Sequence, residues 1–306
     1  MRGNRRSALG LIAALAIGLA GCATETPAAA PSATGGAYPV TVGSVTLAQQ
    51  PTKIVSLSPT LTEMLFAIGA GKQVTAVDDQ SNFPADAPKT DLSGFKPNAE
   101  AIAAKNPDLV VLSDNLNEIV AQLTTLKIPV FVAPAAKTVE DSYRQIADLG
   151  TLTGHPADAA SLVESMKGRM AAALASVQKR AKPLTYFYEL SPDLYSATSK
   201  TFIGSLFSLA GLTNIADPLD SAATGGYPQL SAEALVKANP DMVFLADTKC
   251  CQQTPETVKA RAGWAGVTAV AKSQIVGLDD DIASRWGPRV VDLFAAITGA
   301  VNKVPA

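Results

Sequence analysis

Short apolar runs alternate with helical apolar patterns along most of this chain. The β-branched run at 53–57 is followed by apolar residues spaced three and four apart, namely Leu61, Met64, Leu65 and Ile68. Such spacing is typical of one buried helix face. Further patterns of both kinds predict strands at 74–77, 109–112 and 129–132 and helices at 99–105 and 118–126. Strands that alternate with helices predict a parallel sheet with helices on its faces.

A long helical pattern divides this region from a second one. From 138 to 182 the apolar positions keep helical spacing, and the clearest interruption is the Gly-His-Pro sequence at 154–156. An unbroken helix of about 25 residues after that break would be about 37 Å long and could join two lobes rigidly. Beyond it, the pattern predicts strands at 184–190, 242–245 and 274–278 and helices at 202–210, 232–237 and 290–302.

An internal repeat relates the two regions. Residues 98–115 return at 231–248 without a gap and with nine identities in eighteen positions. Each copy reads helix, Asn-Pro-Asp, strand. We therefore predict an α/β fold of two Rossmann-like lobes with mainly parallel sheets, joined by one long rigid helix, with a ligand cleft between the lobes. The expected boundaries are an N-terminal lobe at 39–137, the helical stretch at 138–182 and a C-terminal lobe at 183–306.

The N-terminus has the layout of an export signal. Arg2, Arg5 and Arg6 precede an apolar run at 8–20, which is short for a bilayer span. Residues 1–21 are therefore predicted to be a signal peptide. The run ends in Leu-Ala-Gly before Cys22, which resembles a bacterial lipobox, so Cys22 is the predicted lipidation site; an ordinary secretory signal with a stray cysteine is the alternative. Residues 22–38, rich in Ala, Pro, Thr, Ser and Gly, are expected to form a flexible tether.

Composition excludes several function classes. Removal of residues 1–21 leaves 22 basic and 27 acidic residues, a net charge near −5, and no basic cluster that would bind nucleic acid. His155 is the only histidine, and its Gly-His-Pro context predicts an exposed turn. A His-rich metal site and a His-dependent hydrolase are therefore not expected, and no phosphate-binding glycine loop follows the first strand. We expect no catalytic residues and no bound metal site.

Several segments together resemble one known family. They are the lipobox, the sequence IVSLSPTLTEMLFAIGAG at 54–71, the two Asn-Pro-Asp units, the long helix and DIASRWGPR at 281–289. The set resembles the iron-chelate and cobalamin class of substrate-binding lipoproteins of ABC importers, over roughly residues 50–302, and is nearest the cobalamin-binding branch. The resemblance implies a monomer on the outer face of the cell membrane, held there by its lipid anchor. It also implies no chemistry on the ligand and no resident cofactor.

The resemblance further implies a role and partners. The protein would capture a metal chelate and deliver it to the permease and ATPase subunits of an importer. Cobalamin or another corrinoid is favoured, with a ferric siderophore or haem next. The alternative is an envelope lipoprotein that has lost small-molecule binding and contacts another protein. An enzyme acting on an envelope substrate ranks last, because the histidine base is missing.

Members of the family dock on the permease through one acidic residue on each lobe. Glu63 matches the first position and lies off the apolar stripe of its helix, so it is expected to face water. The matching place in the second lobe is Thr213, which departs from the family pattern. Asp217 is the predicted substitute, and Asp220 is a second candidate. An ordinary solvated helix carboxylate is the alternative for Glu63.

Candidate ligand residues come from loops that follow the strands, because ligands of open α/β sheets bind beyond the carboxyl ends of the strands. Tyr227 begins a Tyr-Pro-Gln-Leu-Ser run that resembles one in cobalamin-binding members. Arg285 offers a guanidinium fork and Trp286 a flat apolar wall; pairing of the arginine with neighbouring acids and packing of the tyrosine on its own lobe are the alternatives. The full predicted set is Ser58, Pro59, Thr60, Asp79, Phe83, Asn115, Tyr188, Tyr195, Tyr227, Lys249, Cys250, Cys251, Asp280, Arg285 and Trp286.

Two adjacent cysteines stand out within that set. Cys250 and Cys251 follow a predicted strand in a chain expected to be exported, where disulfides form readily. With Cys22 lipidated, no other cysteine is left to pair with them. A vicinal disulfide that shapes a cleft loop is the favoured interpretation. An intermolecular bridge and free thiols that bind a soft metal are the alternatives.

Overall fold

The computed structural model describes residues 37–305. The predicted signal peptide, Cys22 and most of the predicted tether lie outside the described residues. Tyr38 already makes a specific contact, because its hydroxyl donates to the carbonyl of Leu152 at 3.0 Å. A small antiparallel hairpin follows, formed by β1 (Val40–Val42) and β2 (Val45–Leu47). This hairpin was not predicted from the sequence.

The first lobe is built on a four-stranded parallel sheet in the order β4-β3-β5-β6. Its strands are β3 (Ile54–Leu57), β4 (Val74–Val77), β5 (Leu109–Leu112) and β6 (Val130–Val132). All residues of β3 and β5 are buried, because helices cover both faces of the sheet. The connecting helices are α1 (Pro59–Ala67), η1 (Ala70–Gln73), α2 (Ala99–Ala103), η2 (Leu116–Glu118) and α3 (Ile119–Thr125).

The second lobe repeats this plan with the parallel order β10-β9-β7-β8. Its strands are β7 (Thr185–Glu189), β8 (Thr213–Asn214), β9 (Met242–Leu245) and β10 (Ile275–Gly277). Its helices are α6 (Phe202–Leu209), η3 (Asp217–Leu219), α7 (Ala232–Ala238), α8 (Pro255–Lys259), α9 (Thr268–Ala271), α10 (Asp280–Ala283) and α11 (Val290–Lys303). The predicted α/β fold with parallel sheets is confirmed.

The repeat is visible in matching hydrogen bonds. Asp108 Oδ2 accepts from the backbone nitrogen of Thr52 at 2.7 Å, and Asp241 Oδ2 accepts from that of Thr185 at 2.8 Å. In both copies the threonine hydroxyl donates to the same carboxylate oxygen at 2.9 Å. The aspartate of each Asn-Pro-Asp unit therefore holds the start of the neighbouring strand in register.

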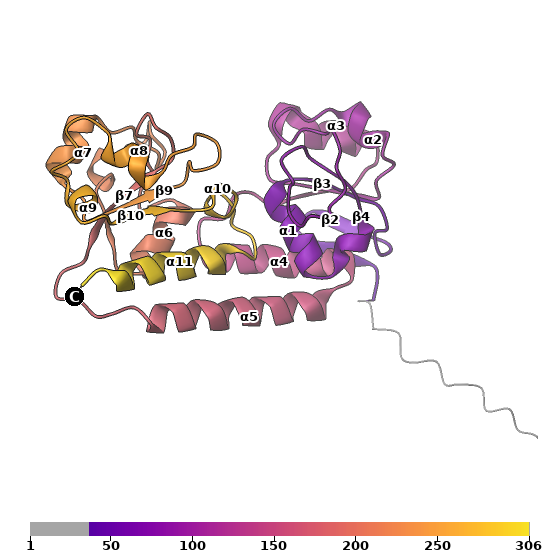
Figure 1. Cartoon of the computed structure of the whole chain (residues 1–306). Helices are drawn as coiled ribbons and strands as arrows, with labels where there is room; N and C mark the ends of the chain where they lie inside the picture. The colour runs from indigo at the N-terminus through magenta and orange to yellow at the C-terminus, as the bar shows by residue number, and fades with distance from the viewer. Residues whose placement is uncertain (1–36, 306) are drawn as a thin grey trace, which may run out of the picture. The chain divides into compact units, whose positions relative to one another are not determined.

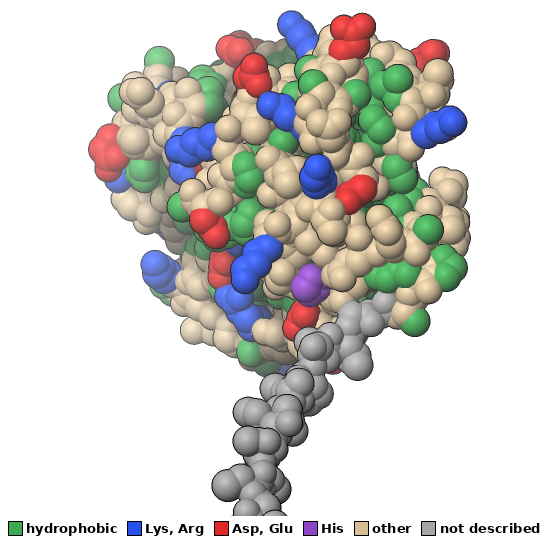
Figure 2. Space-filling model, turned by 90° about the vertical axis from the view of Figure 1, so that its right-hand side faces the viewer, with side chains coloured by type: hydrophobic (Ala, Val, Ile, Leu, Met, Phe, Trp, Pro, Cys, Tyr) green, Lys and Arg blue, Asp and Glu red, His purple; other side chains and the backbone are tan. Residues whose placement is uncertain are grey.

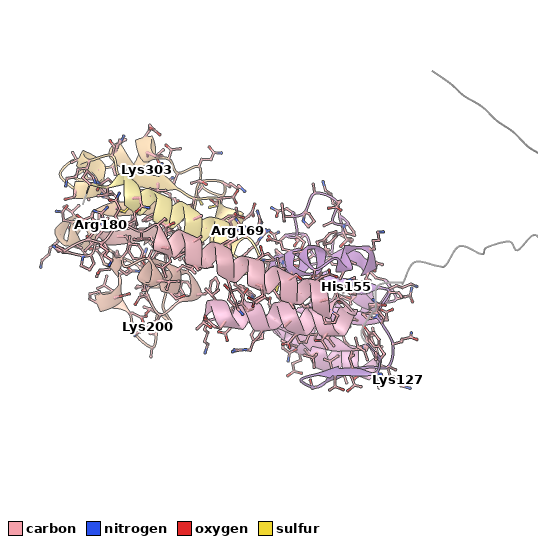
Figure 3. The ribbon with its side chains drawn as sticks, turned by 90° about the horizontal axis from the view of Figure 1, so that it is seen from below. Lys127, His155, Arg169, Arg180, Lys200 and Lys303 are labelled. Carbon is pink, nitrogen blue, oxygen red and sulfur yellow. The ribbon has the colours of Figure 1, made fainter. Side chains whose placement is uncertain are left out.

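Two helices link the lobes. α4 (Val139–Thr153) packs on α1 and β1, and α5 (Pro156–Ala175) packs on both α4 and α11. Figures 1 and 3 show α5 running beneath both sheets, alongside α4 at one end and α11 at the other. The linking helix has 20 residues, so the expected length of about 25 was too long. At 1.5 Å per residue it still extends about 30 Å.

The helices below the two sheets share one continuous apolar core. A single buried cluster includes Leu65 of α1, Ile146 of α4, Met166 of α5, Phe207 of α6 and Phe294 of α11. Each lobe has a smaller separate core on the opposite face of its sheet. Because close-packed interiors deform little, this shared layer stiffens the connection between the lobes.

Charged side chains of both signs are mixed on the face drawn in Figure 2. His155 lies on that face near the start of α5, and its Nδ1 is 3.3 Å from Asp158 Oδ2. Its side chain is 25% exposed, which is consistent with the predicted turn position. Among residues 37–305 no helix combines the length and the apolar character needed to cross a bilayer.

Candidate functional site

A pocket of about 370 Å³ opens at the carboxyl ends of the first-lobe strands. Residues from all four strand ends line it, as the rule for open α/β sheets predicts. The segment that joins α10 to α11 closes it from the side of the second lobe. The lining residues that the argument uses are Ser58, Pro59, Thr60, Asp78, Gly94, Phe95, Asp114, Asp281, Arg285 and Trp286.

A buried ion cluster holds that closing segment against the first lobe. Glu63 is 2% exposed and accepts from Arg285 Nη1 at 2.7 Å and from Arg289 Nε at 2.9 Å. The hydrogen bond to Glu63 raises the pKa of Arg289. Arg285 also donates to the Gln80 carbonyl and to Asp281 Oδ1. Two guanidinium groups around one carboxylate therefore join α1 to the region before α11.

Trp286 is anchored by α4. Its indole Nε1 donates to Gln145 Oε1 at 2.7 Å, and its carbonyl accepts from the Ser142 hydroxyl. Gln145 in turn donates to the Pro134 carbonyl at 2.6 Å. Both partners of Trp286 lie on α4. The indole is thus oriented before any ligand arrives, which favours binding by a preformed wall.

Asp78 sits deep in the pocket, directly after β4. It is 3% exposed, and its Oδ1 accepts from the Ser81 hydroxyl, which lies 2.8 Å from the hydroxyl of Thr62. Burial is the main cause that raises the pKa of Asp78, to about 6. The predicted residue set omits Asp78 and names the adjacent Asp79 instead, which is exposed and does not line the pocket.

Phe95 is a second lining residue that the sequence analysis missed. Its ring is 74% exposed, which is unusual for a large apolar side chain and leaves it free to cover a ligand. It lies in the stretch between β4 and α2, which has no apolar periodicity, and the only available signal was an aromatic residue after Ser-Gly. Phe95 and Trp286 together give the pocket two aromatic surfaces.

Five of the predicted ligand residues do line the pocket. They are Ser58, Pro59, Thr60, Arg285 and Trp286. Ser58 and Thr60 are almost fully buried, whereas Pro59 is half-buried at the start of α1. Arg285 is 7% exposed, and its pairing with Asp281 matches the alternative in which its guanidinium binds a neighbouring acid. Its pairing with Glu63 was not predicted.

Three other first-lobe candidates make contacts outside the pocket lining. The guanidinium carbon of Arg289 lies over the Phe83 ring, 4.1 Å from the ring centroid. Asn115 Oδ1 accepts from the backbone nitrogen of Val120 and so satisfies a donor in the first turn of α3. Asp79 projects into solvent and pairs its backbone nitrogen with the Leu92 carbonyl.

Tyr188 lies in the core of the second lobe and does not line the pocket. Tyr188 is 1% exposed, packs edge-on against Phe207 and donates its hydroxyl to the Ala283 carbonyl at 3.1 Å. Because β7 is covered on both faces, a side chain in this strand cannot reach the pocket. Tyr195 and Tyr227 are exposed on second-lobe loops and do not line the pocket, so their ligand role stays a prediction.

The second-lobe loop at 248–251 is organised by acids rather than by a disulfide. Asp280 accepts from three successive backbone nitrogens, at 248–250, and Lys249 Nζ lies 2.8 Å from Asp279 and 2.7 Å from Asp281. Cys250 and Cys251 are exposed free thiols, so the favoured vicinal disulfide is not found. The hydrogen bond with Cys251 and burial raise the pKa of Cys250 to about 12. None of these four candidates lines the pocket.

The expectation that Glu63 faces water is also wrong. α1 is covered on nearly every side, and its polar residues Thr60, Thr62 and Glu63 are all buried. A carboxylate held by two arginines is not available on the surface for a permease. Asp217 is half-buried and accepts from the backbone nitrogen of Ser199 at 2.8 Å, and its docking role stays a prediction.

A second buried acid group lies below the cysteine loop. Glu189 and Asp247 are both fully buried, and Arg261 donates to both oxygens of Glu189, at 2.5 and 2.7 Å. Neither carboxylate oxygen of Asp247 has a hydrogen-bond partner among the described residues. Burial and the neighbouring Glu189 raise the pKa of Asp247 to about 7.

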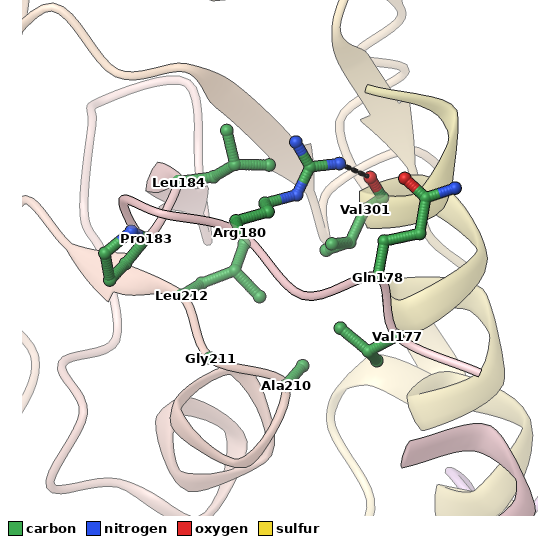
Figure 4. A pocket seen from close by; sticks show the side chains of 9 residues that line it. All are labelled: Val177, Gln178, Arg180, Pro183, Leu184, Ala210, Gly211, Leu212 and Val301. Carbon is green, nitrogen blue, oxygen red and sulfur yellow. Dashed lines mark hydrogen bonds between the residues drawn. The ribbon is translucent and has the colours of Figure 1, made fainter. Parts of the chain in front are cut away.

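Two further pockets lie at the opposite, amino ends of the second-lobe strands. The smaller, about 170 Å³, is drawn in Figure 4, where Arg180 donates to the Val301 carbonyl at 2.8 Å. The larger lies between β10 and α11 and includes Met242, the first residue of β9. Neither position fits the rule for ligand sites in α/β sheets. Within residues 37–305 no three His, Cys, Asp or Glu side chains come together to hold a metal ion.

Comparisons with known proteins agree with this architecture. The family described as periplasmic binding protein matches residues 54–282. An uncharacterized ABC transporter substrate-binding lipoprotein, YvrC of Bacillus subtilis, is 30% identical over 273 residues, covering 83% of each chain. A cobalamin-binding protein of Halobacterium salinarum is 30% identical over 273 residues, covering 85% of this chain and 72% of the relative.

A solved structure matches as well. A possible iron-binding, periplasmic solute-binding protein from Staphylococcus epidermidis superimposes with a TM-score of 0.71 at 27% identity. The match covers 83% of this chain and all of the other.

Proposed function

Because this chain belongs to the periplasmic binding protein family, we propose that it captures a metal chelate outside the cytoplasm and delivers it to the permease of an ABC importer. The family resemblance stated from the sequence is confirmed. Members of the family are non-enzymatic transporter components, so the expectation that the chain is not an enzyme is confirmed too. Permease and ATPase subunits are the partners of such proteins.

One observation carries the proposal to this particular pocket. The pocket lies at the carboxyl ends of the strands and presents Phe95 and Trp286, two aromatic surfaces suited to the flat or apolar faces of a chelate. At about 370 Å³ it would cover part of a large chelate and leave the rest in solvent. Cobalamin or another corrinoid is the favoured ligand, supported by the cobalamin-binding relative from Halobacterium. Ferric siderophores and haem come next.

Calorimetric titration of the chain from residue 37 onward with cyanocobalamin, haem, ferrichrome and ferrioxamine B tests the proposal. Ala135→Trp would fill the pocket, because Ala135 lines it and is exposed. Ala296→Trp is the matched control in the groove between β10 and α11. Saturable binding that Ala135→Trp abolishes and Ala296→Trp retains is expected. If none of these chelates binds, the alternative of an envelope interaction module would be favoured.

We also propose a lipid anchor at Cys22, on the sequence evidence alone. Metabolic labelling of the full chain with a fatty acid should mark the wild type and leave Cys22→Ala unmarked. Labelling of Cys22→Ala at the same level would contradict the anchor.

A further inference from the structure

The pocket is acidic, and its one guanidinium is already engaged. Among the described residues that line it, the groups charged at neutral pH are the carboxylates of Asp78, Asp114 and Asp281 and the guanidinium of Arg285. Arg285 binds Glu63, Asp281 and a backbone carbonyl, so no N–H fork is left for a ligand carboxylate. An anionic ligand would enter this pocket against a negative field.

Among these acids, Asp78 is the one placed to contact a ligand directly. Ser81 donates to its Oδ1, and its Oδ2 accepts no hydrogen bond from any described group. Gly94 stands next to that oxygen, and a Cβ built on Gly94 would come within 2.9 Å of Oδ2 and 2.8 Å of the Leu57 carbonyl. The missing side chain therefore keeps Oδ2 within reach of the pocket. Because Asp78 lines the pocket, a carboxylate oxygen without a protein donor can accept a hydrogen bond from a bound ligand.

Resting on the proposed function, we propose that Asp78 is a specificity-determining residue: its Oδ2 accepts a hydrogen bond from an N–H of the ligand, and its charge selects chelates without net negative charge. Amide-bearing corrinoids and neutral or cationic hydroxamate complexes fit this chemistry. Chelates whose periphery carries carboxylates are disfavoured. Selection here works by repulsion of the wrong ligand as well as by attraction of the right one.

Matched chelate pairs separate this inference from the identity of the ligand. The pairs are cyanocobalamin and its monocarboxylic acid, N-acetyl and N-succinyl ferrioxamine B, and haem dimethyl ester and haem. The acid partner carries one carboxylate that the other lacks in the first two pairs and two in the haem pair. Whichever class binds, we expect the partner without the added carboxylate to bind about tenfold more tightly at pH 7.5.

Two variants assign the preference to Asp78. Asp78→Asn keeps the shape and the Ser81 contact, and it should lower the preference within a pair to about threefold or less. Gly94→Ala keeps the acid but covers Oδ2, and it should weaken binding of the preferred partner. Asp79→Asn is the matched control, because Asp79 is the adjacent exposed carboxylate and lies outside the pocket lining. It should leave the preference within twofold of wild type.

The outcomes are distinct. Equal affinity within the pairs, or a preference that Asp78→Asn leaves intact, would overturn the inference while the proposed function stands. Binding of none of the six probes would overturn the proposed function and the inference with it. Circular dichroism of each variant checks that folding is retained.

Discussion

Glu63 and Arg289 lie 226 residues apart in the sequence and form a two-point ion pair, with Arg289 Nε and Nη2 each donating to one carboxylate oxygen. Arg285 adds a third hydrogen bond to the same group. Because removal of one partner from a buried pair leaves uncompensated charge, Glu63→Gln should lower the free energy of unfolding by about 3 kcal/mol. Chemical denaturation of the variant measures this change.

Glu164→Gln provides the control for that experiment. Glu164 is an exposed helix carboxylate that pairs with Lys167 at 2.7 Å. Its removal should change the free energy of unfolding by at most about 0.5 kcal/mol. Similar small changes in both variants would show that the buried cluster has no structural role.

Phe95 and Phe83 are both exposed aromatic residues of the first lobe, but only Phe95 lines the pocket. Phe95→Ala should weaken binding of the captured chelate about tenfold, because it removes an aromatic surface. Phe83→Ala removes a ring that stacks on Arg289 and should leave the dissociation constant within about twofold. Titration calorimetry measures the dissociation constant of both variants. A larger loss of affinity in Phe83→Ala than in Phe95→Ala would show that the ligand binds outside this pocket.

Asp247 should make stability fall as pH rises. Its pKa is about 7 in the folded chain and 3.8 in the reference state. The folded state therefore binds more protons than the unfolded state between about pH 4 and pH 7, and stability is lost as pH rises through that window. Asp247→Asn removes this loss and should stabilise the chain by about 1 to 3 kcal/mol more at pH 8 than at pH 4.

Asp114→Asn is the matched control for that prediction, because Asp114 occupies the same position in the first copy of the repeat. Asp114 is exposed, so its replacement should change the melting temperature little. If Asp247→Asn changed the free energy of unfolding equally at pH 4 and pH 8, the pH dependence could not be assigned to Asp247.

The Cys250 thiol should react slowly with alkylating reagents. Its pKa of about 12 keeps it protonated at pH 8, and the first cause is the hydrogen bond with Cys251. Iodoacetamide should therefore modify Cys250 more slowly than a cysteine in an unfolded peptide. Cys251→Ala removes that cause and should raise the rate, which peptide mass spectrometry of timed samples measures. An unchanged rate would point to another source of protection.

The main strands were predictable because most are short apolar runs, and β3, β5 and β9 are buried along their whole length. The β1–β2 hairpin and β8 were missed, since strands of three and two residues leave little pattern. Ser58 was predictable as a pocket residue because it follows β3 directly. Asp78 follows β4 just as directly, but the predicted set names its neighbour Asp79. Glu63 was placed in water because its partners, Arg285 and Arg289, come together with it only in the folded chain.

The position of Tyr188 also depends on contacts that form only in the folded chain. A tyrosine near the end of a strand has the chemistry of a ligand residue, but its exposure depends on what covers the sheet. Here α6 and the end of α10 supply its neighbours, Phe207 and the Ala283 carbonyl. The Asp78 and Asp79 pair differs in the same way, because one step along the backbone separates a buried acid from an exposed one.

The segment from Arg285 to Arg289 is fastened to α1 and α4, and the helical layer beneath both lobes is one packed core. An importer that meets this protein would therefore find nearly the same outer surface whether the pocket is empty or full. Discrimination between loaded and unloaded molecules would have to occur at the mouth of the pocket, where part of the cargo itself is visible. Empty molecules would then compete with loaded ones for the permease, so uptake would depend on the ratio of the two forms as well as on the amount of cargo.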